Sequence, residues 1–92
     1  MLNAAVEADD ANPALRQRAA LVMDSMRRVI KRAVREGQQS GKIQERVTPD
    51  AVAVVFICTL EGAVMMSKLY GNQNAMRLAV RHLEQYLESI MV

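Results

Sequence analysis

The segment from Phe56 to Asn72, FICTLEGAVMMSKLYGN, constrains the fold of this chain more than any other. It is apolar almost throughout, yet it contains Glu61 and Gly62 near its middle and ends at a Gly-Asn pair. Upstream, Thr48 and Pro49 are residue types that helices favour at the N-cap and at the first helical position. We therefore predict one long apolar helix. The fold must then bury each of the apolar faces of this helix.

The same start and stop signals predict two more helices. Asn12 and Pro13 begin the first, and Asn72 or Asn74 begins the last. The sequence has no alternating strand pattern, so we predict an all-α fold of three antiparallel-packed helices. The expected segments are a helix from 13 to a point between Gly37 and Gly41, a linker over 42–47, a helix over 49–71, and a helix from 72 or 74 to the C-terminus. Residues 1–11 resemble the tail of another helix followed by a turn.

At about 100° per residue, the first and last predicted helices each carry a single apolar stripe. In the first helix the stripe contains Leu15, Ala19, Val22, Met26, Ile30 and Ala33, opposite Asp24, Arg28, Lys31 and Arg35. In the last helix it contains Met76, Ala79, Val80, Leu83, Leu87 and Ile90, opposite Arg77, Arg81, Glu84 and Glu88. Both are ordinary amphipathic helices with one face for a core.

The middle helix has two apolar stripes on either side of a narrow polar seam. One stripe, with small residues at its middle, contains Ala51, Val55, Cys58, Gly62, Met65 and Leu69. The other contains Ala53, Phe56, Ile57, Leu60 and Val64, and the seam contains Asp50, Glu61, Lys68 and Asn72. A helix that is apolar on two flanks must be covered on both.

The other two helices of the chain are too few to cover both stripes. We therefore predict that the small-residue stripe contacts a second copy of the chain. Gly62 lowers helix propensity by about 1 kcal/mol, which is tolerable where another backbone approaches closely. Glu61 would lie at the edge of that contact, with Arg77 or Arg81 of either chain as its counter-ion. The predicted interface contains Ala51, Val55, Cys58, Gly62, Met65, Leu69, Met76, Leu83 and Leu87. The alternative is that the linker and residues 1–8 cover this stripe.

Catalytic and metal chemistry have little support. The single histidine, His82, is expected at a surface or interface, and the single cysteine, Cys58, is expected to be a small buried hydrophobe. No cluster of residues has metal-ligand spacing and no glycine-rich loop could cradle a phosphate. We predict no enzyme activity, no catalytic residue, no metal and no cofactor.

The chain is also expected to be cytoplasmic. The first ten residues, MLNAAVEADD, lack the basic start and apolar core of a signal peptide. The apolar run over 51–60 is shorter than the ~20 residues that a membrane span needs, and Glu61 interrupts its extension, so no membrane partner is predicted. One cysteine excludes an internal disulfide and is compatible with a reducing compartment.

The first helix is rich in basic residues, and such a stretch can neutralise phosphates. The residues are Arg16, Arg18, Arg27, Arg28, Lys31, Arg32 and Arg35. Because Arg16, Arg18 and Arg32 point in different directions, and because Asp24 can pair with Arg28, a solvated helix face is the favoured interpretation. A basic nucleic-acid-binding protein remains the weaker alternative.

Four stretches, in order, resemble the C-terminal regulatory domain of the TetR family of bacterial transcriptional repressors. They are LNAAVEADDANPALRQRA, AVREGQQSGKI, TPDAVAVVFICTLEGAVMMSKLYGN and AMRLAVRHLEQYL. The resemblance covers nearly the whole chain, and TLEGAVMMSKLYG is its most specific part. It implies that the last two helices pair with their copies as an intersubunit four-helix bundle, and that the preceding helices enclose a small-molecule pocket.

Family members begin with a helix-turn-helix domain, which this sequence does not contain. We therefore expect residues 1–92 to be a truncated regulatory and dimerisation domain, which reaches operator DNA only through a domain absent from this chain. Its predicted function is dimerisation and sensing of a small apolar effector. The predicted pocket residues are Met23, Met26, Phe56 and Leu60. The alternative is a stand-alone helical homodimeric interaction module without a ligand, in which these side chains simply pack the core.

Overall fold

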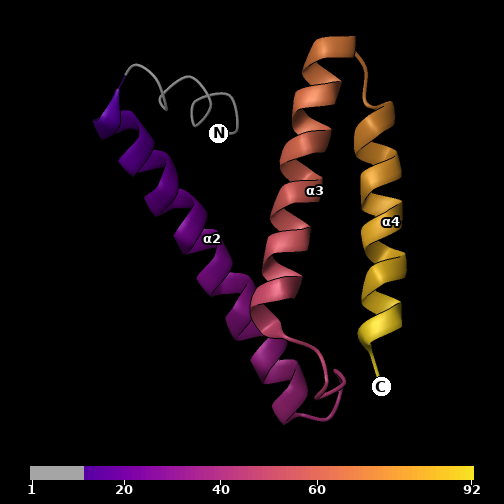
Figure 1. The fold of residues 1–92 in the computed structure, drawn as a ribbon. Coiled ribbons are helices and arrows are strands. Elements are labelled where there is room, and N and C mark those ends of the chain that lie inside the picture. The colour runs from indigo at the N-terminus through magenta and orange to yellow at the C-terminus, as the bar shows by residue number, and fades with distance from the viewer. Residues whose placement is uncertain (1–11) are drawn as a thin grey trace.

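The computed structural model describes residues 12–92, which form three helices. They are α2 (Pro13–Gln39), α3 (Pro49–Tyr70) and α4 (Asn74–Ile90). In Figure 1, α3 and α4 lie side by side and antiparallel, whereas α2 meets the N-terminal end of α3 and diverges from it toward its own N-terminus. The predicted all-α fold is confirmed. The tail and turn predicted for residues 1–11 lie outside the described part of the chain.

The helices begin close to the predicted positions. Asn12 caps α2, since its Oδ1 accepts a hydrogen bond of 3.1 Å from the backbone N–H of Leu15. Thr48 occupies the N-cap position of α3, but its hydroxyl makes no capping hydrogen bond. The turn between α3 and α4 uses Gly71, whose φ of 69° lies in the left-handed region that glycine adopts without strain.

The linker is fastened to the C-terminus. The N–H of Gln44 donates to the carbonyl of Ile90 at 2.9 Å, and the N–H of Val92 donates to the carbonyl of Lys42 at 2.9 Å. The side-chain amide of Gln44 also donates to the carbonyls of Ser89 and Met91. These bonds hold the linker against the end of α4, so the N-terminus of α3 starts from a fixed position.

The buried core lies at the end of the molecule where all three helices and the linker meet. Its centre consists of Val34, Val47, Val52 and Ile90, packed against Ile30, Ile43, Phe56 and Tyr86. The rings of Phe56 and Tyr86 contact each other with centroids 6.1 Å apart. This core joins one residue or more from each helix, and it positions α2 and α4 on α3.

The stripe predicted for α2 is wrong in part. Val34 is buried in place of Ala33, which is exposed, and Leu15 and Val22 are exposed as well. The reason is the divergence of α2 from α3 toward the N-terminus of α2 (Figure 1). Ala19 is nevertheless buried as predicted. In α4, Leu83 and Ile90 are buried as predicted, but Val80 and Leu87 are exposed.

On α3, the side covered by the other two helices includes Val52, Ala53, Ile57 and Ala63, all buried. The helix continues to Tyr70, well beyond the run over 51–60, so by length and composition alone it could cross a membrane. The expectation that it is too short is therefore wrong for the helix as a whole. Its burial on one side nevertheless shows that it packs as part of a helical domain.

Replacement of Val34 by alanine should lower the free energy of unfolding by about 2 kcal/mol, because it leaves a cavity among buried side chains. Val34 is 4% exposed and Val29, on the same helix, is 70% exposed. Val29→Ala is therefore the matched control, and it should change stability by less than about 0.5 kcal/mol. Urea denaturation followed by circular dichroism at one fixed protein concentration would measure both. Equal effects of the two substitutions would contradict the assignment of the core.

Candidate functional site

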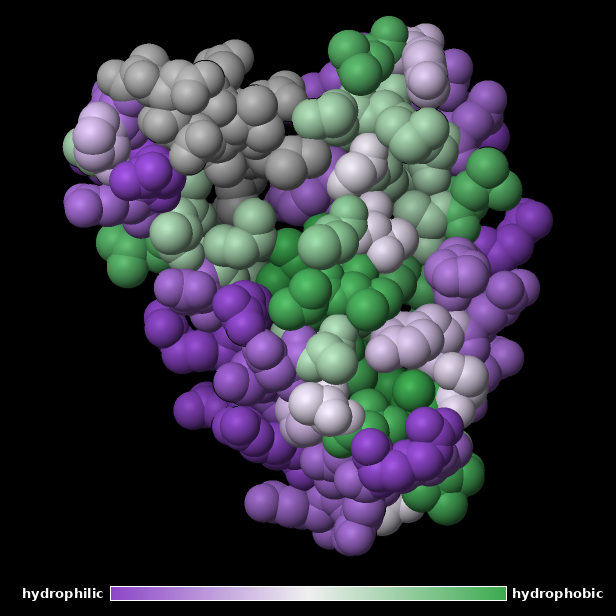
Figure 2. All heavy atoms as spheres, in the orientation of Figure 1, coloured by the Kyte–Doolittle hydropathy of each residue, from purple (hydrophilic) through white to green (hydrophobic). Residues whose placement is uncertain are grey.

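One long face of α3 has no cover within residues 12–92. Figure 2 shows hydrophobic surface running along α3 on the side that faces the viewer. Val54, Val55 and Met66 are about two-fifths exposed, and Leu69 is 74% exposed. A Cβ built on Gly62, near the middle of this face, would meet no atom within 4 Å. The small-residue stripe is thus open within residues 12–92, and we call it the open face of α3.

Most of the predicted interface residues lie on or beside this face. Ala51, Val55, Cys58, Leu69 and Leu87 are exposed, and Gly62, Met65 and Met76 are half-buried. Leu83 is buried inside the chain, so it is not available to a partner in this arrangement. Cys58 is exposed, and the prediction that it is a buried hydrophobe is wrong for the single chain.

Several exposed apolar residues were absent from the prediction. Val54, Met66 and Tyr70 of α3 are exposed, and so is Leu78 of α4, which falls outside the apolar stripe of that helix. On a helical wheel Val54 lies beside Cys58. This position could have identified Val54 as part of the exposed face. The open face is therefore broader than the predicted stripe.

A partly open cavity of about 370 Å³ lies between α2 and α3. Its lining contains Met23, Arg27, Val54, Ile57, Cys58 and Glu61. Of the four predicted pocket residues, Met23 lines this cavity. Met26 lines a different hollow with Ser25, Val29 and Ile30, and Phe56 packs in the core. Leu60 is half-buried on α3 and is not among the described residues that line the cavity. The cavity exists because α2 diverges from α3, which opens it on the flank that carries Val54 and Cys58.

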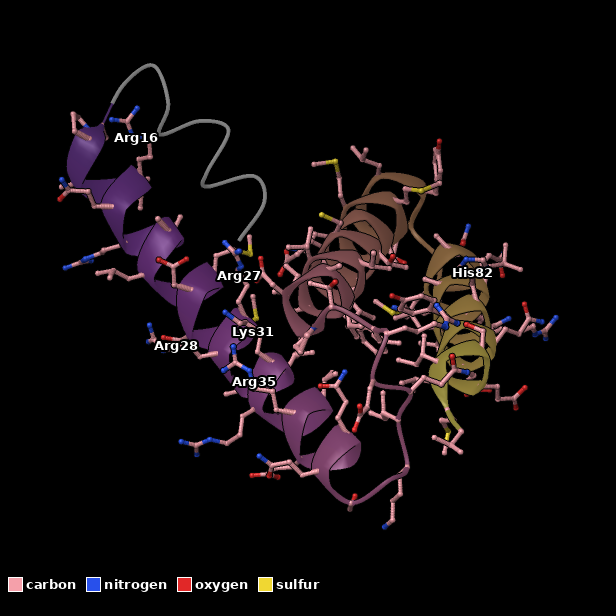
Figure 3. All side chains as sticks on the ribbon, turned by 60° about the horizontal axis from the view of Figure 1, so that its bottom comes forward. Arg16, Arg27, Arg28, Lys31, Arg35 and His82 are labelled. Carbon is pink, nitrogen blue, oxygen red and sulfur yellow. The ribbon has the colours of Figure 1, made fainter. Side chains whose placement is uncertain are left out.

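An ion pair at the wall of this cavity joins α2 to the first turn of α3. The guanidinium of Arg27 donates from Nη2 to Oδ1 and Oδ2 of Asp50 at 2.8 and 2.7 Å, and from Nε to Oδ1 at 3.2 Å. In Figure 3, Arg27, Lys31 and Arg35 follow one side of α2, and Arg28 lies on the other. The hydrogen bond from Arg27, together with the positive charges of Arg27, Lys31 and Arg35, lowers the pKa of Asp50.

Asp24 also approaches Arg27, with Oδ1 3.9 Å from Nη1. Arg28 instead donates to the hydroxyl of Ser25 at 3.2 Å, so the predicted pairing of Asp24 with Arg28 is wrong. The spacing of three residues brings Asp24 onto the side of α2 where Arg27 lies. Arg27 is thus flanked by two carboxylates, one from each of two helices.

Glu61 is the second ionisable group of the cavity, and it is half-buried. Within residues 12–92 its carboxylate makes no ion pair and no hydrogen bond. The predicted counter-ions of the same chain do not reach it, since Arg77 donates to Asn74 at 3.4 Å. Pairing with an arginine of a second copy stays a prediction.

Metal ligation finds no support in residues 12–92, where no three His, Cys, Asp or Glu side chains come together. His82 is exposed on α4, far from the basic side chains of α2 (Figure 3). The arrangement offers an apolar surface, an apolar cavity and an unpaired carboxylate.

Residues 1–83 match the family described as the tetracyclin repressor-like C-terminal domain. A TetR transcriptional regulator from Chloroflexus aurantiacus J-10-FL is 37% identical and superposes with a TM-score of 0.93, over 98% of this chain and 46% of that one. A TetR family transcriptional regulator from Cytophaga hutchinsonii is 25% identical, with a TM-score of 0.92, over 99% of this chain and 46% of that one. No curated protein matches the chain. This chain therefore spans slightly less than half the length of either regulator.

Asp50→Asn should lower stability at neutral pH, and the loss should depend on pH. The pKa of Asp50 lies below its ordinary value of 3.8 in the folded chain. Its ionised form therefore stabilises the fold above pH 3.8, and this contribution is lost as the pH falls through the lowered pKa. We expect the urea midpoints of the original and Asp50→Asn chains to differ at pH 7 and to converge as the pH falls below 3.8.

A double-mutant cycle with Arg27→Gln separates the ion pair from the favourable effect of any carboxylate in the first turn of a helix. If the pair carries the effect, Asp50→Asn costs little once Arg27 is replaced. A loss of the same size in both backgrounds would assign the effect to the helix terminus.

Proposed function

The chain belongs to the family of tetracyclin repressor-like C-terminal domains, and from this premise we propose that it is the dimerisation and effector-sensing part of a bacterial transcriptional repressor. The family consists of transcriptional regulators and not of enzymes. The similar regulators are about twice as long as this chain. Operator binding is accordingly proposed for the intact protein only, through a helix-turn-helix domain, in the cytoplasm of a bacterium.

The open face of α3 is the observation that carries dimerisation. Scattered exposed apolar residues are normal, but a contiguous apolar patch indicates a site of protein association. A second copy related by two-fold symmetry would place its own open face on this one. With α4 beside α3 in each copy, four helices would then share one core.

Gly62 supports close approach in such a dimer. Nothing in residues 12–92 occupies the space beside its Cα, so the single chain does not need a glycine there for packing. A glycine inside a helix lowers stability by about 1 kcal/mol relative to alanine. Another helix backbone lying against Gly62 would offset that cost by contacts that a side chain would block.

The linker does not cover the open face, which weakens one alternative. Its backbone bonds go to α4 and the C-terminus, and Val47 points into the core. The part of that alternative that concerns residues 1–8 lies outside the described chain. A second copy remains the cover that the apolar pattern favours.

Effector sensing is supported by the cavity between α2 and α3. Its volume of about 370 Å³ is within the range of small-molecule sites. Val54 and Cys58 belong both to the cavity wall and to the open face of α3. A bound molecule would therefore contact α2 and the dimerising helix together, and a movement of α2 would alter the spacing of the two DNA-reading domains in the intact repressor.

Two other functions remain as alternatives, and both predict different behaviour. A stand-alone helical dimer would show no ligand binding at the cavity. A basic nucleic-acid-binding domain would be retained on heparin in a salt-dependent way, but Arg27 is already paired with Asp50, which reduces the basic surface of α2. Elution at low salt would exclude the second alternative.

Gly62→Leu should convert a dimer into a monomer, because four added side-chain carbons would block the approach of the partner. Leucine favours helix more than glycine does, and the site is open in the single chain, so the variant should still fold. Native mass spectrometry at low micromolar concentration should show twice the chain mass of 10.2 kDa for the original sequence and the single mass for the variant.

Ala14→Leu is the control, since Ala14 is exposed in the first turn of α2 and away from the open face. This variant should stay dimeric. A Gly62→Leu variant that dimerises with unchanged affinity, or an original chain that is monomeric, would overturn the proposed interface. A reproducible additional mass on the dimer would support a retained effector.

A further inference from the structure

Among the described residues that line the cavity between α2 and α3, Glu61 is the one carboxylate. Apart from Arg27, the other described lining residues are Met23, Val54, Ile57 and Cys58. Glu61 is half-buried and has no hydrogen bond or ion pair within residues 12–92. Apolar walls exclude water from part of its surroundings, so its charge is less well solvated than that of a fully exposed carboxylate.

Arg27 is the one cation among the described lining residues, and its charge is already compensated. Asp50 accepts three hydrogen bonds from it, the shortest at 2.7 Å, and Asp24 lies 3.9 Å away. A bidentate arginine–carboxylate pair of this kind is geometrically specific, and both of its side chains are about two-fifths exposed. Within residues 12–92, the negative charge of Glu61 therefore has no counter-ion in the cavity wall.

Such a wall favours one class of molecule. A ligand with an apolar body and a protonated amine would place the body against Met23, Val54 and Ile57 and its N–H groups on the carboxylate. A charge-assisted hydrogen bond of this type is about twice as strong as a neutral one. A carboxylate ligand would meet repulsion from Glu61 and would find Arg27 occupied. The flexible, polarisable thioether of Met23 fits apolar groups of varied shape.

We propose that this cavity binds a small amphipathic organic cation, whose ammonium group pairs with Glu61. The inference rests on the proposed sensing function and adds the chemical class of the effector. Glu61 is the residue that determines specificity, whereas Asp50 compensates the charge of Arg27, the cation of the same wall.

Three aromatic probes with the same naphthylmethyl body and different charges test the charge preference. They are 1-naphthylmethylamine, which is a cation at neutral pH, the neutral 1-naphthylmethanol, and the anion 1-naphthylacetate. Naphthalene fluorescence measures binding directly, because the chain contains no tryptophan. The Glu61→Gln variant locates the bound probe, because an amine that binds at this wall must lose affinity when the charge of the Glu61 carboxylate is removed.

The amine should bind at least tenfold more tightly than the alcohol, and the carboxylate should bind least. Glu61→Gln keeps the shape of the side chain and removes its charge, so it should reduce amine affinity about tenfold, to the level of the alcohol. Glu84→Gln is the matched control, since Glu84 is exposed on α4 outside the cavity. It should leave all three affinities unchanged.

The outcomes separate this inference from the function on which it rests. Equal or tighter binding of the alcohol or the carboxylate, or an unchanged amine affinity in Glu61→Gln, would overturn the cation assignment and leave effector sensing in place. A dimer that binds none of the probes would overturn the inference and count against sensing. A monomer in the native mass spectrum would overturn the proposed dimer itself.

Discussion

The structure depends on one constraint, which is that α3 is apolar around most of its circumference in a chain with only two other described helices. α2 and α4 bury one side of it, where Ala53 is fully inaccessible to solvent. The other side, around Gly62, remains open. Burial of apolar area provides about 25 cal/mol per Å², so an open face of this kind represents a large free energy that a single chain does not gain.

The cavity follows from the way in which α2 meets α3. The core of Val34, Val47, Val52 and Ile90 gathers the helices at one end, and the linker bonds to the C-terminus hold that end together. Farther along, α2 diverges from α3 (Figure 1). A cavity lined by side chains of both helices lies between them there. The Arg27–Asp50 ion pair joins α2 to α3 at the cavity wall.

Sequence patterns predicted the helices, their ends and the two-sided character of α3, because these depend on local signals and on the helical period. They predicted only in part which apolar residues of α2 are buried, since Ala19 is buried as expected and Val34 was missed. A helical wheel gives the direction of a side chain but not the crossing angle of two helices, and this angle decides that Val34 is buried while Val22 is exposed. The same limit explains why the exposure of Cys58 was not predicted, since its stripe is apolar but uncovered. It also explains why the cavity position of Glu61 was not predicted, since that position depends on where α2 lies.

The shared wall of the cavity and the open face has a thermodynamic consequence. Val54 and Cys58 belong to both surfaces, so in the proposed dimer a ligand and a partner chain would act on the same segment of α3. Where two binding events influence one structural element, the change that the first causes in the affinity of the second equals the reverse change. Any effector that alters the position of α2 through this cavity must therefore alter dimer affinity by the same factor by which dimerisation alters effector affinity. The short segment of α3 around Val54 and Cys58 would then couple effector sensing to dimer assembly.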